Sequence, residues 1–225
     1  MSNVIAIIPA RSGSKSIIDK NVVLLSGHPL IAYSIASARL SGGIDRVIVS
    51  TDCKEIAEVS RGYNAEVIMR SDKLAQDDTP TLPVLQDLIS KIADKYDAVM
   101  TLQPTSPLRT VSHINEAISI FIDDATADSL VSVVKTPHNF MPEKLMTYDG
   151  KYLTGSSIVK RRQDMSVVYA RNGAAIYITK TDKLDQYIFG GKILPFFMNK
   201  LDSIDIDEME DWNIVERLIN RGRNL

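Results

Sequence analysis

Short apolar runs alternate along the first half of the chain with segments of helical periodicity. Four apolar runs have the length of buried strands: residues 4–8, 46–50, 65–69 and 98–102. Three intervening segments repeat apolar side chains at the spacing of one helix face: residues 29–40, 52–62 and 80–95. This β-α-β-α-β-α-β order predicts an α/β fold, in which a mostly parallel sheet carries helices on both faces. Ligands of such sheets bind at the carboxyl ends of the strands.

The second half continues this pattern after one interruption. Thr110 or Ser112 caps a helix that runs to about Phe121, and residues 129–134 form the next strand. Four further elements are predicted: a strand at 174–179, a short helix at 181–187, a strand at 193–198 and a helix over about 207–221. Two pairs of acidic residues also have the spacing of a helix capping box: Asp52 with Glu55, and Asp207 with Glu210.

The interruption covers residues 135–171, where no apolar period persists. Pro137 and Pro142 break regular structure, and Asp149-Gly150 is typical of a tight hairpin turn. We therefore expect an irregular, β-rich insertion within one domain that spans residues 1–225. Such an arm packs either against another subunit or over its own domain, and the sequence allows both.

Composition is that of an ordinary globular protein, with 225 residues, 44% of them hydrophobic, and a formal net charge of -2. Because basic residues do not outnumber acidic ones, no nucleic acid partner is expected. Because no apolar run reaches ~20 residues, no membrane span is expected. The first residues lack the charged region of a secretory leader, so the cytoplasm is the expected compartment. Cys53 is the only cysteine, which excludes an intrachain disulfide.

The loop after the first strand is suited to binding an anion. Gly13 lies between two serines, so the backbone can turn tightly and direct N–H groups at a ligand. Arg11, Lys15 and Lys20 add positive charge. The alternative is a basic turn whose charges are only solvated. A dinucleotide fingerprint needs three glycines, and this loop has one, which argues against a dehydrogenase.

A second polar segment, T-L-Q-P-T-S-P-L-R, follows the strand at 98–102. Its two prolines restrict the backbone, and the amide of Gln103 lies where an open α/β sheet binds its ligand. The segment is either a recognition site for a small polar substrate or a rigid turn that starts a helix.

A third segment, S-I-D-I-D, ends in two aspartates. Side chains alternate along an extended chain, so Asp205 and Asp207 point to one side and can share a hard cation such as Mg²⁺. The alternative is that Asp207 only caps the last helix. The three histidines are scattered and predict no metal site. The basic run from Lys160 to Arg162 is either a solvated face or a contact for an acidic substrate.

Five segments resemble the CMP-sialic acid synthetases, or acylneuraminate cytidylyltransferases, in order and spacing over essentially the whole chain. They are I-P-A-R-S-G-S-K with K-N at 20–21, V-S-T-D at 49–52, L-Q-P-T-S-P-L-R at 102–109, N-G-A at 172–174, and S-I-D-I-D at 203–207. The related 3-deoxy-manno-octulosonate (Kdo) synthetases share I-P-A-R but are less similar in the polar turn and the aspartate pair.

This resemblance implies a Rossmann-like nucleotidyltransferase that uses Mg²⁺ to transfer CMP from CTP to a nine-carbon 2-keto sugar acid, with release of pyrophosphate. It implies nucleotide contacts for seven residues: Arg11, Ser14, Lys15, Lys20, Asn21, Arg70 and Thr81. It implies sugar contacts for Gln103, Arg162 and Asn172, and metal ligation by Asp205 and Asp207. Arg11, Lys20 and the two aspartates are the implied catalytic residues. The family forms homodimers, so the insertion is expected to be a dimerisation arm.

The chain also departs from the family pattern. Ser16 stands where glycine is common, and Ile18-Asp19 stands where Pro-Arg is frequent. Two alternatives remain open from the sequence: another sugar nucleotidyltransferase, such as one acting on Kdo or a sugar 1-phosphate, and a non-catalytic nucleotide-sugar sensor. The aspartate pair together with Lys20 favours the enzyme. The sequence leaves open which sugar is used: N-acetylneuraminate, its deaminated form, legionaminate or pseudaminate.

Overall fold

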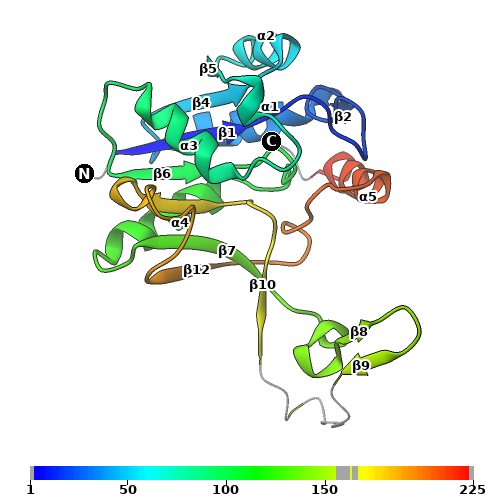
Figure 1. Ribbon diagram of the computed structural model, residues 1–225. Coiled ribbons are helices and arrows are strands. Elements are labelled where there is room, and N and C mark those ends of the chain that lie inside the picture. Colours follow the sequence, from blue (N-terminus) through cyan, green and yellow to red (C-terminus); the bar gives the residue numbers. More distant parts are fainter. Residues whose placement is uncertain (1–2, 156–162, 164–166, 223–225) are drawn as a thin grey trace.

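The computed structural model describes residues 3–155, 163 and 167–222. Four parallel strands form one half of its main sheet (Figure 1), in the order β5 (Glu66–Met69), β4 (Arg46–Thr51), β1 (Val4–Pro9) and β6 (Ala98–Thr101). Along β1, Val4, Ala6 and Ile8 face one side of the sheet and Ile5 and Ile7 the other. Both sides of this strand are therefore buried, as its unbroken apolar run predicts.

The other half of the sheet is mixed. Its strands are β7 (Ser129–Lys135), β10 (Tyr169–Arg171), β11 (Tyr177–Lys180) and β12 (Ile193–Met198). β11 runs antiparallel to both β6 and β7, β10 runs antiparallel to β7, and β12 runs parallel to β7. Within the described residues the sheet has eight strands. The predicted α/β class with a mostly parallel sheet is confirmed.

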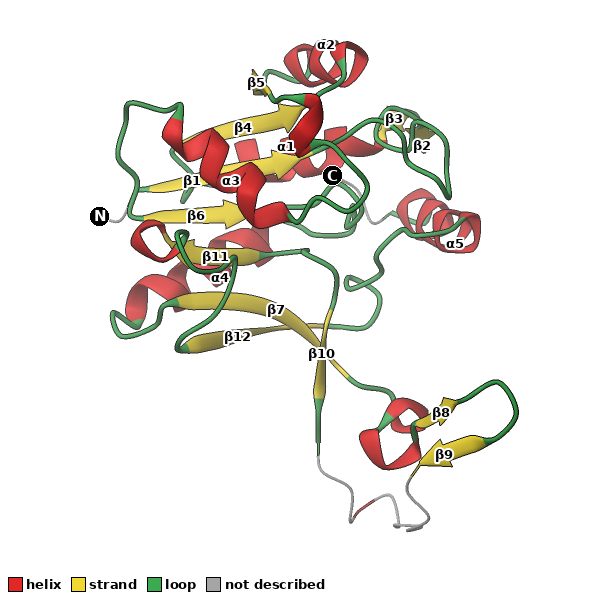
Figure 2. Ribbon diagram, viewed as in Figure 1, coloured by secondary structure: helices red, strands yellow, loops and turns green. Residues whose placement is uncertain are grey.

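Helices cover both faces of the sheet (Figure 2). On one face lie α1 (Leu30–Arg39), α2 (Lys54–Gly62) and α4 (Val111–Asp123). The opposite face is covered by α3 (Thr81–Ser90) together with the 3-10 helix Thr181–Lys183. None of the described helices is long and apolar enough to span a bilayer.

The last helix, α5 (Met209–Asn220), packs beside the sheet in a separate apolar cluster. Trp212, Val215 and Ile219 bury their side chains there, against Ile17 from the loop after β1 and Ile206 from the segment before α5. A small hairpin of β2 (Leu24–Leu25) and β3 (His28–Pro29) also contributes to this cluster. The first and last thirds of the chain thus share a core.

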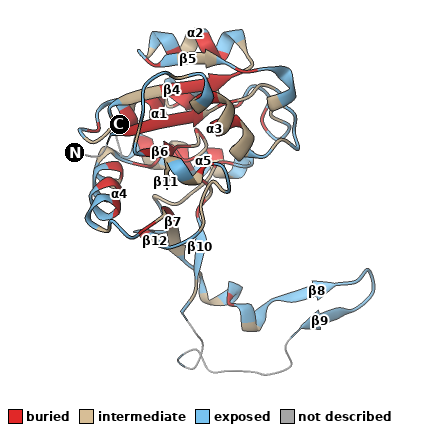
Figure 3. Ribbon diagram, turned by 60° about the vertical axis from the view of Figure 1, so that its left-hand side comes forward, coloured by how far each residue is buried: buried red, intermediate tan, exposed pale blue. Residues whose placement is uncertain are grey.

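The insertion leaves the sheet at the end of β7 and returns through β10. It holds the 3-10 helices His138–Phe140 and Pro142–Lys144 and a hairpin of β8 (Met146–Tyr148) and β9 (Leu153–Gly155). The predicted turn lies at this hairpin, where the backbone N–H groups of Lys151 and Tyr152 donate to Asp149 Oδ1. The described part of the arm projects from the sheet and is largely exposed (Figure 3).

Several predicted boundaries are wrong for identifiable reasons. Cys53, and not Asp52, is the N-cap of α2, because the Asp52 carboxylate accepts hydrogen bonds from Ser12. Glu208, and not Asp207, is the N-cap of α5, because the Asp211 carboxylate accepts the Glu208 N–H at 3.0 Å. The predicted start of α4 is confirmed, because Thr110 is its N-cap and the Thr110 side chain accepts the His113 N–H.

Three other elements are shorter than predicted. The helix over 80–95 ends at Ser90, where i to i+3 hydrogen bonds tighten the last turn. β11 starts at Tyr177 and not at 174, because Gly173 adopts φ +68° and Ile176 N–H donates to the Ser132 side chain. The predicted helix at 181–187 is reduced to the single 3-10 turn.

Candidate active site

Several of the predicted site residues lie at the carboxyl edge of the parallel strands. The phosphate loop, defined here as residues 11–21, follows β1; Asp52 follows β4, Arg70 follows β5 and Gln103 follows β6. Because all four strands run in the same direction, the segments after them meet at one edge. The sheet thus brings together residues that lie far apart in the sequence.

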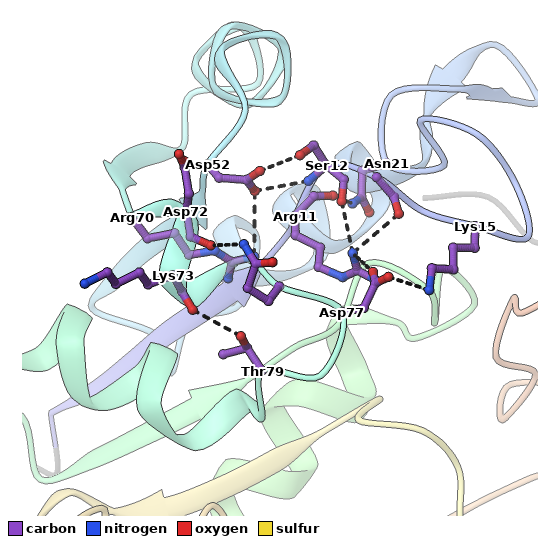
Figure 4. A network of polar contacts seen from close by, with 12 residues as sticks. Arg11, Ser12, Lys15, Asn21, Asp52, Arg70, Asp72, Lys73, Asp77 and Thr79 are labelled. Carbon is purple, nitrogen blue, oxygen red and sulfur yellow. Dashed lines mark hydrogen bonds and ion pairs between the residues drawn. The ribbon is translucent and has the colours of Figure 1, made fainter.

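The phosphate loop turns at Gly13, which adopts φ +70° as its glycine predicts. Two of its cations are paired with one carboxylate. Asp77 Oδ1 lies 2.6 Å from Arg11 Nη1, and Asp77 Oδ2 lies 2.5 Å from Lys15 Nζ (Figure 4). These contacts lower the pKa of Asp77, with the Lys15 hydrogen bond as the largest cause. The sequence offered no indication of Asp77, whose carboxylate is the anion that pairs with these two cations.

Asp52 fixes the start of the loop from the end of β4. It accepts hydrogen bonds from the backbone N–H and the hydroxyl of Ser12, and its Oδ1 lies 3.9 Å from Arg70 Nη2. Arg70 is 8% exposed, and burial lowers its pKa. Its Nε is buried without a hydrogen-bond partner among the described residues, which leaves one donor available to a ligand.

The far end of the loop is anchored by Lys20 and Asn21. Asn21 Nδ2 donates to the Arg11 carbonyl at 3.1 Å and so closes the loop on itself. Lys20 is buried, and its Nζ donates 2.7 Å to the carbonyl of Ile206, the residue between the two predicted metal ligands. The phosphate loop and the carboxylate segment, residues 203–207, are therefore in direct contact.

Asp205 lies in a mostly buried position beside the turn after β6. Ser106 Oγ donates to Asp205 Oδ1 at 3.3 Å, and the Ile206 N–H donates to the Thr105 carbonyl at 2.8 Å. Burial raises the pKa of Asp205, and the nearby negative charge of Asp207 raises it further. Two carboxylates that disfavour each other's charge in a partly dry site fit a divalent cation.

No cluster of three or more His, Cys, Asp or Glu side chains suited to a metal ion occurs among the described residues. A cation at Asp205 and Asp207 would therefore take its remaining ligands from water and from a bound ligand. Oxygen donors of that kind suit a hard cation, which commonly uses one or two protein carboxylates together with substrate phosphates.

The polar turn after β6 is held by a buried arginine. Arg109 Nη1 donates to the carbonyls of Ala175 at 2.7 Å and Gln103 at 3.3 Å, and Nη2 donates to Ser34 Oγ at 2.5 Å. Burial lowers the pKa of Arg109 to about 9, and the charge of Asp205 opposes this effect. Arg109 thus fixes the backbone of Gln103, whose side-chain amide has no hydrogen-bond partner among the described residues.

A pocket of about 390 Å³ opens next to this amide. Gln103 and Thr81, both predicted site residues, line it together with Arg171, Tyr177 and Phe189. The Arg171 guanidinium lies 4.8 Å from the centre of the Phe189 ring, and the Tyr177 and Phe189 rings pack edge to face. Tyr177 and Phe189 were missed in the sequence because they lie on β11 and in an irregular loop without a motif.

The last two predicted sugar residues differ in what the structure describes. Asn172 is buried: Oδ1 accepts from Ser132 Oγ at 2.7 Å, and Nδ2 donates to Ser203 Oγ at 3.0 Å and to Met198 Sδ at 3.2 Å. This side chain links β7 and the carboxylate segment, and its contact with a sugar stays a prediction. Arg162 lies outside the described residues.

Comparison with known proteins matches the chain to the cytidylyltransferase family over residues 5–219. It is 35% identical to CMP-N,N'-diacetyllegionaminic acid synthase of Legionella pneumophila, with 96% of each chain covered. It is 32% identical to post-translational flagellin modification protein B of Campylobacter coli, covering 100% of this chain and 98% of that protein. N-acylneuraminate cytidylyltransferase of Escherichia coli is 33% identical over 95% of this chain, which spans about half (51%) of that relative.

Solved structures share the fold at low sequence identity. CMP:2-keto-3-deoxy-manno-octonic acid synthetase complexed with CTP has a TM-score of 0.77 at 17% identity, covering 98% of this chain and 99% of that one. The 4-diphosphocytidyl-2C-methyl-D-erythritol synthase of Anaerococcus prevotii has a TM-score of 0.65 at 12% identity, with the same coverage. With the sequence match over residues 5–219 and a phosphate loop joined to a carboxylate pair, the chain belongs to the cytidylyltransferase family and is a nucleotidyltransferase.

Proposed function

We propose that this enzyme transfers CMP from CTP to the anomeric hydroxyl of a nonulosonic acid, a nine-carbon 2-keto sugar acid, and releases pyrophosphate. The observation that carries the proposal is the contact of Lys20 with the Ile206 carbonyl, which joins cations suited to a triphosphate to a carboxylate pair suited to a cation. The full-length relative from Legionella pneumophila, which is named for a legionaminic acid, supports this class of sugar.

The reaction breaks a phosphoanhydride linkage and forms a phosphoester linkage. The sugar hydroxyl oxygen bonds to the α-phosphorus of CTP, and the bond from that phosphorus to the bridging oxygen breaks, so pyrophosphate leaves with the electron pair. Asp205 and Asp207 would hold Mg²⁺, which would supply positive charge to neutralise the triphosphate. Arg11 and Lys15 stabilise the charge that develops on the leaving group. Asp207, the exposed carboxylate of the pair, accepts the hydroxyl proton directly or through water.

CTP would lie along the carboxyl edge of the parallel strands. The phosphate loop, including Ser14, Lys20 and Asn21, surrounds the triphosphate. Arg70 offers its unpartnered Nε, and Thr81 lies at the start of α3 on the rim of the pocket. In this arrangement Asp77 must give up its contacts with Arg11 and Lys15 when the triphosphate binds.

The sugar acid would occupy the pocket beside Gln103. The hydroxyl and amide groups of the sugar acid would form hydrogen bonds with the Gln103 amide, and the carboxylate of the sugar acid would pair with the Arg171 guanidinium. The aromatic walls, Tyr177 and Phe189, suit the apolar face of a sugar ring. Arg162 and Asn172 stay predicted sugar contacts.

The arm is the proposed dimer contact. Leu145, Met146 and Leu153 are 54%, 52% and 61% exposed on it, and Tyr169 and Phe197 form an exposed aromatic pair at its base, 4.8 Å between ring centres. Apolar side chains exposed together in this way are typical of a surface that a partner covers. A homodimer, measured by light scattering, would support this use of the arm; a monomer at all concentrations would contradict it.

The decisive experiment is pyrophosphate release from CTP and Mg²⁺ with a panel of N-acetylneuraminate, its deaminated form, legionaminate, pseudaminate and Kdo. We expect release with at least one nonulosonate and little with Kdo. Release only with Kdo would show that the substrate is Kdo and not a nonulosonic acid. Tight CTP binding without release from any sugar would favour a non-catalytic sensor.

A further inference from the structure

The backbone of Asp207 is held from two sides by residues that have no assigned role. Ser16 Oγ, on the phosphate loop, donates to the Asp207 carbonyl oxygen. Asp211 Oδ2, in the first turn of α5, accepts the Asp207 N–H at 3.0 Å. Among the described residues, no hydrogen bond engages the carboxylate of Asp207. Its backbone is therefore fixed while its carboxylate stays exposed and available to a cation.

Two further contacts lie next to the Ser16 hydrogen bond. Ile17 is buried and packs in the same apolar cluster as Ile206, and the buried Lys20 ammonium donates to the Ile206 carbonyl. The phosphate loop is thus joined to the carboxylate segment at three neighbouring points. Ser16 is the point closest to Asp207, and among the described residues only its hydroxyl donates to the carbonyl of Asp207.

We propose that Ser16 is a positioning residue whose hydroxyl holds the Asp207 backbone, and with it the point from which the carboxylate extends, at a fixed place relative to the phosphate loop. This inference rests on the proposed function, because it takes the loop as the triphosphate site and the aspartate pair as the cation site. With both sites held as one unit, CTP and the divalent cation bind together with little rearrangement. Asp211 supplies the opposing contact from α5, so that Asp207 is held between the two.

An exposed hydrogen bond that served only the fold would behave differently. Its loss would change thermal stability slightly and would leave the dependence of CTP binding on Mg²⁺ unchanged. A positioning role also predicts nearly constant stability, but it predicts a clear shift in the Mg²⁺ dependence of CTP binding. The dependence of nucleotide binding on Mg²⁺ therefore separates the two roles.

Trp212 offers a direct readout. It is the only tryptophan in the chain, follows Asp211 in α5, and is buried in the same cluster as Ile206. We would titrate Mg²⁺ at fixed CTP and follow the Trp212 fluorescence, with calorimetric titration of CTP at several Mg²⁺ concentrations as a second measure. Neither measurement needs a sugar acid.

Three variants test the inference. Ser16→Ala removes the hydroxyl, and Ser16→Thr keeps it. Ser112→Ala is the matched control, because it removes an exposed serine hydrogen bond, to Glu116 on α4, away from the site. We expect the half-saturating Mg²⁺ concentration to rise about fivefold in Ser16→Ala, the effect of one lost hydrogen bond, and to stay constant in the other two.

An unchanged Mg²⁺ dependence in Ser16→Ala would overturn the inference, as would an equal shift in Ser16→Thr, since the hydroxyl would then not be the cause. Failure of the proposed function is recognised separately. If the Ser16→Ala shift appears but no nonulosonate releases pyrophosphate, the positioning role stands and the substrate assignment falls.

Discussion

Gly173 lies so close to Asp205 that a Cβ atom at position 173 would sit 2.7 Å from Asp205 Oδ2. Gly173 also adopts φ +68°, which side chains disfavour. We therefore expect Gly173→Ala to displace the Asp205 carboxylate and to reduce kcat/KM for CTP by at least ~10-fold, the effect of a small misplacement in a site of this kind. Steady-state kinetics at saturating Mg²⁺ would measure the loss.

Gly27→Ala is the matched control for that change. Gly27 has φ +91°, but nothing lies within 4 Å of a Cβ atom built there. Both variants should lose about 1 kcal/mol of stability from backbone strain. Only the Gly173 variant should lose activity, and equal activity in the two would show that the contact with Asp205 is unimportant.

In the proposed function, Asp77 would compete with the triphosphate for the two loop cations. Asp77→Asn frees Arg11 and Lys15, so we expect the KM for CTP to fall about two- to fivefold, as suits the loss of an exposed ion pair. The effect should shrink in high salt, which screens exposed charges. Asp78→Asn, the same charge change one residue away, should leave KM unchanged. A higher KM in Asp77→Asn would mean that Asp77 helps to bind the nucleotide.

Arg109 is a buried cation that lysine should not replace. A lysine ammonium cannot reach the Ala175 carbonyl and the Ser34 hydroxyl at once. Burial lowers the pKa of Arg109 and would lower that of a lysine as well, and the ordinary pKa of lysine is already below that of arginine. We expect Arg109→Lys to lose about 3 kcal/mol in urea unfolding. Arg217→Lys, at an exposed position of α5, should change stability by less than ~0.5 kcal/mol. Similar values for the two variants would contradict the structural role of Arg109.

The edge of the parallel half carries a bidentate ion pair. Arg46 Nε lies 2.7 Å from Glu66 Oε2, and Arg46 Nη2 lies 2.6 Å from Glu66 Oε1, which joins β4 to β5. The hydrogen bond from Arg46 lowers the pKa of Glu66. A lowered carboxyl pKa stabilises the fold above the ordinary pKa of glutamate, and this contribution is lost as the pH falls through the lowered value.

Because Glu66 is 43% exposed, solvent screens the pair and the contribution is small. We expect Glu66→Gln to cost about 0.5–1 kcal/mol at pH 7, with the difference from the unchanged protein vanishing once the pH has fallen below the lowered pKa of Glu66. Urea unfolding at pH 7 and at a series of lower pH values would measure it. A difference that persisted at low pH would show that packing, and not charge, is responsible.

The parts of the fold that the sequence predicted are those that depend on local pattern. The strand at residues 4–8 is apolar throughout, which is the pattern of a strand with both faces covered, so its burial could be predicted from the local sequence. The predicted start of α2 was wrong because the Asp52 carboxylate accepts a hydrogen bond from Ser12, 40 positions away, and does not cap the helix. The direction of β11 also follows from distant contacts, since its partners are β6 and β7.

The residues of the candidate site likewise fall into those that the local sequence predicted and those that it could not predict. The phosphate loop and the aspartate pair were visible because each lies within a short segment of informative residues. Asp77 could not be predicted as a site residue, because an aspartate in a polar loop has no distinctive signal in the sequence until its partners are known. The pocket wall of Tyr177 and Phe189 was invisible for a similar reason: aromatic residues without periodicity predict only burial, and their common cavity exists only in the folded chain.

The contact between Lys20 and Ile206 joins residues 186 positions apart, and this has a consequence for synthesis on the ribosome. The parallel strands β1, β4, β5 and β6 all lie before residue 102, whereas the carboxylate segment is synthesised near the end of the chain. A growing chain would therefore carry the phosphate loop before its carboxylates exist. In the proposed function, such a chain could not act on CTP until the segment up to Asp207 had been synthesised and had folded onto the loop.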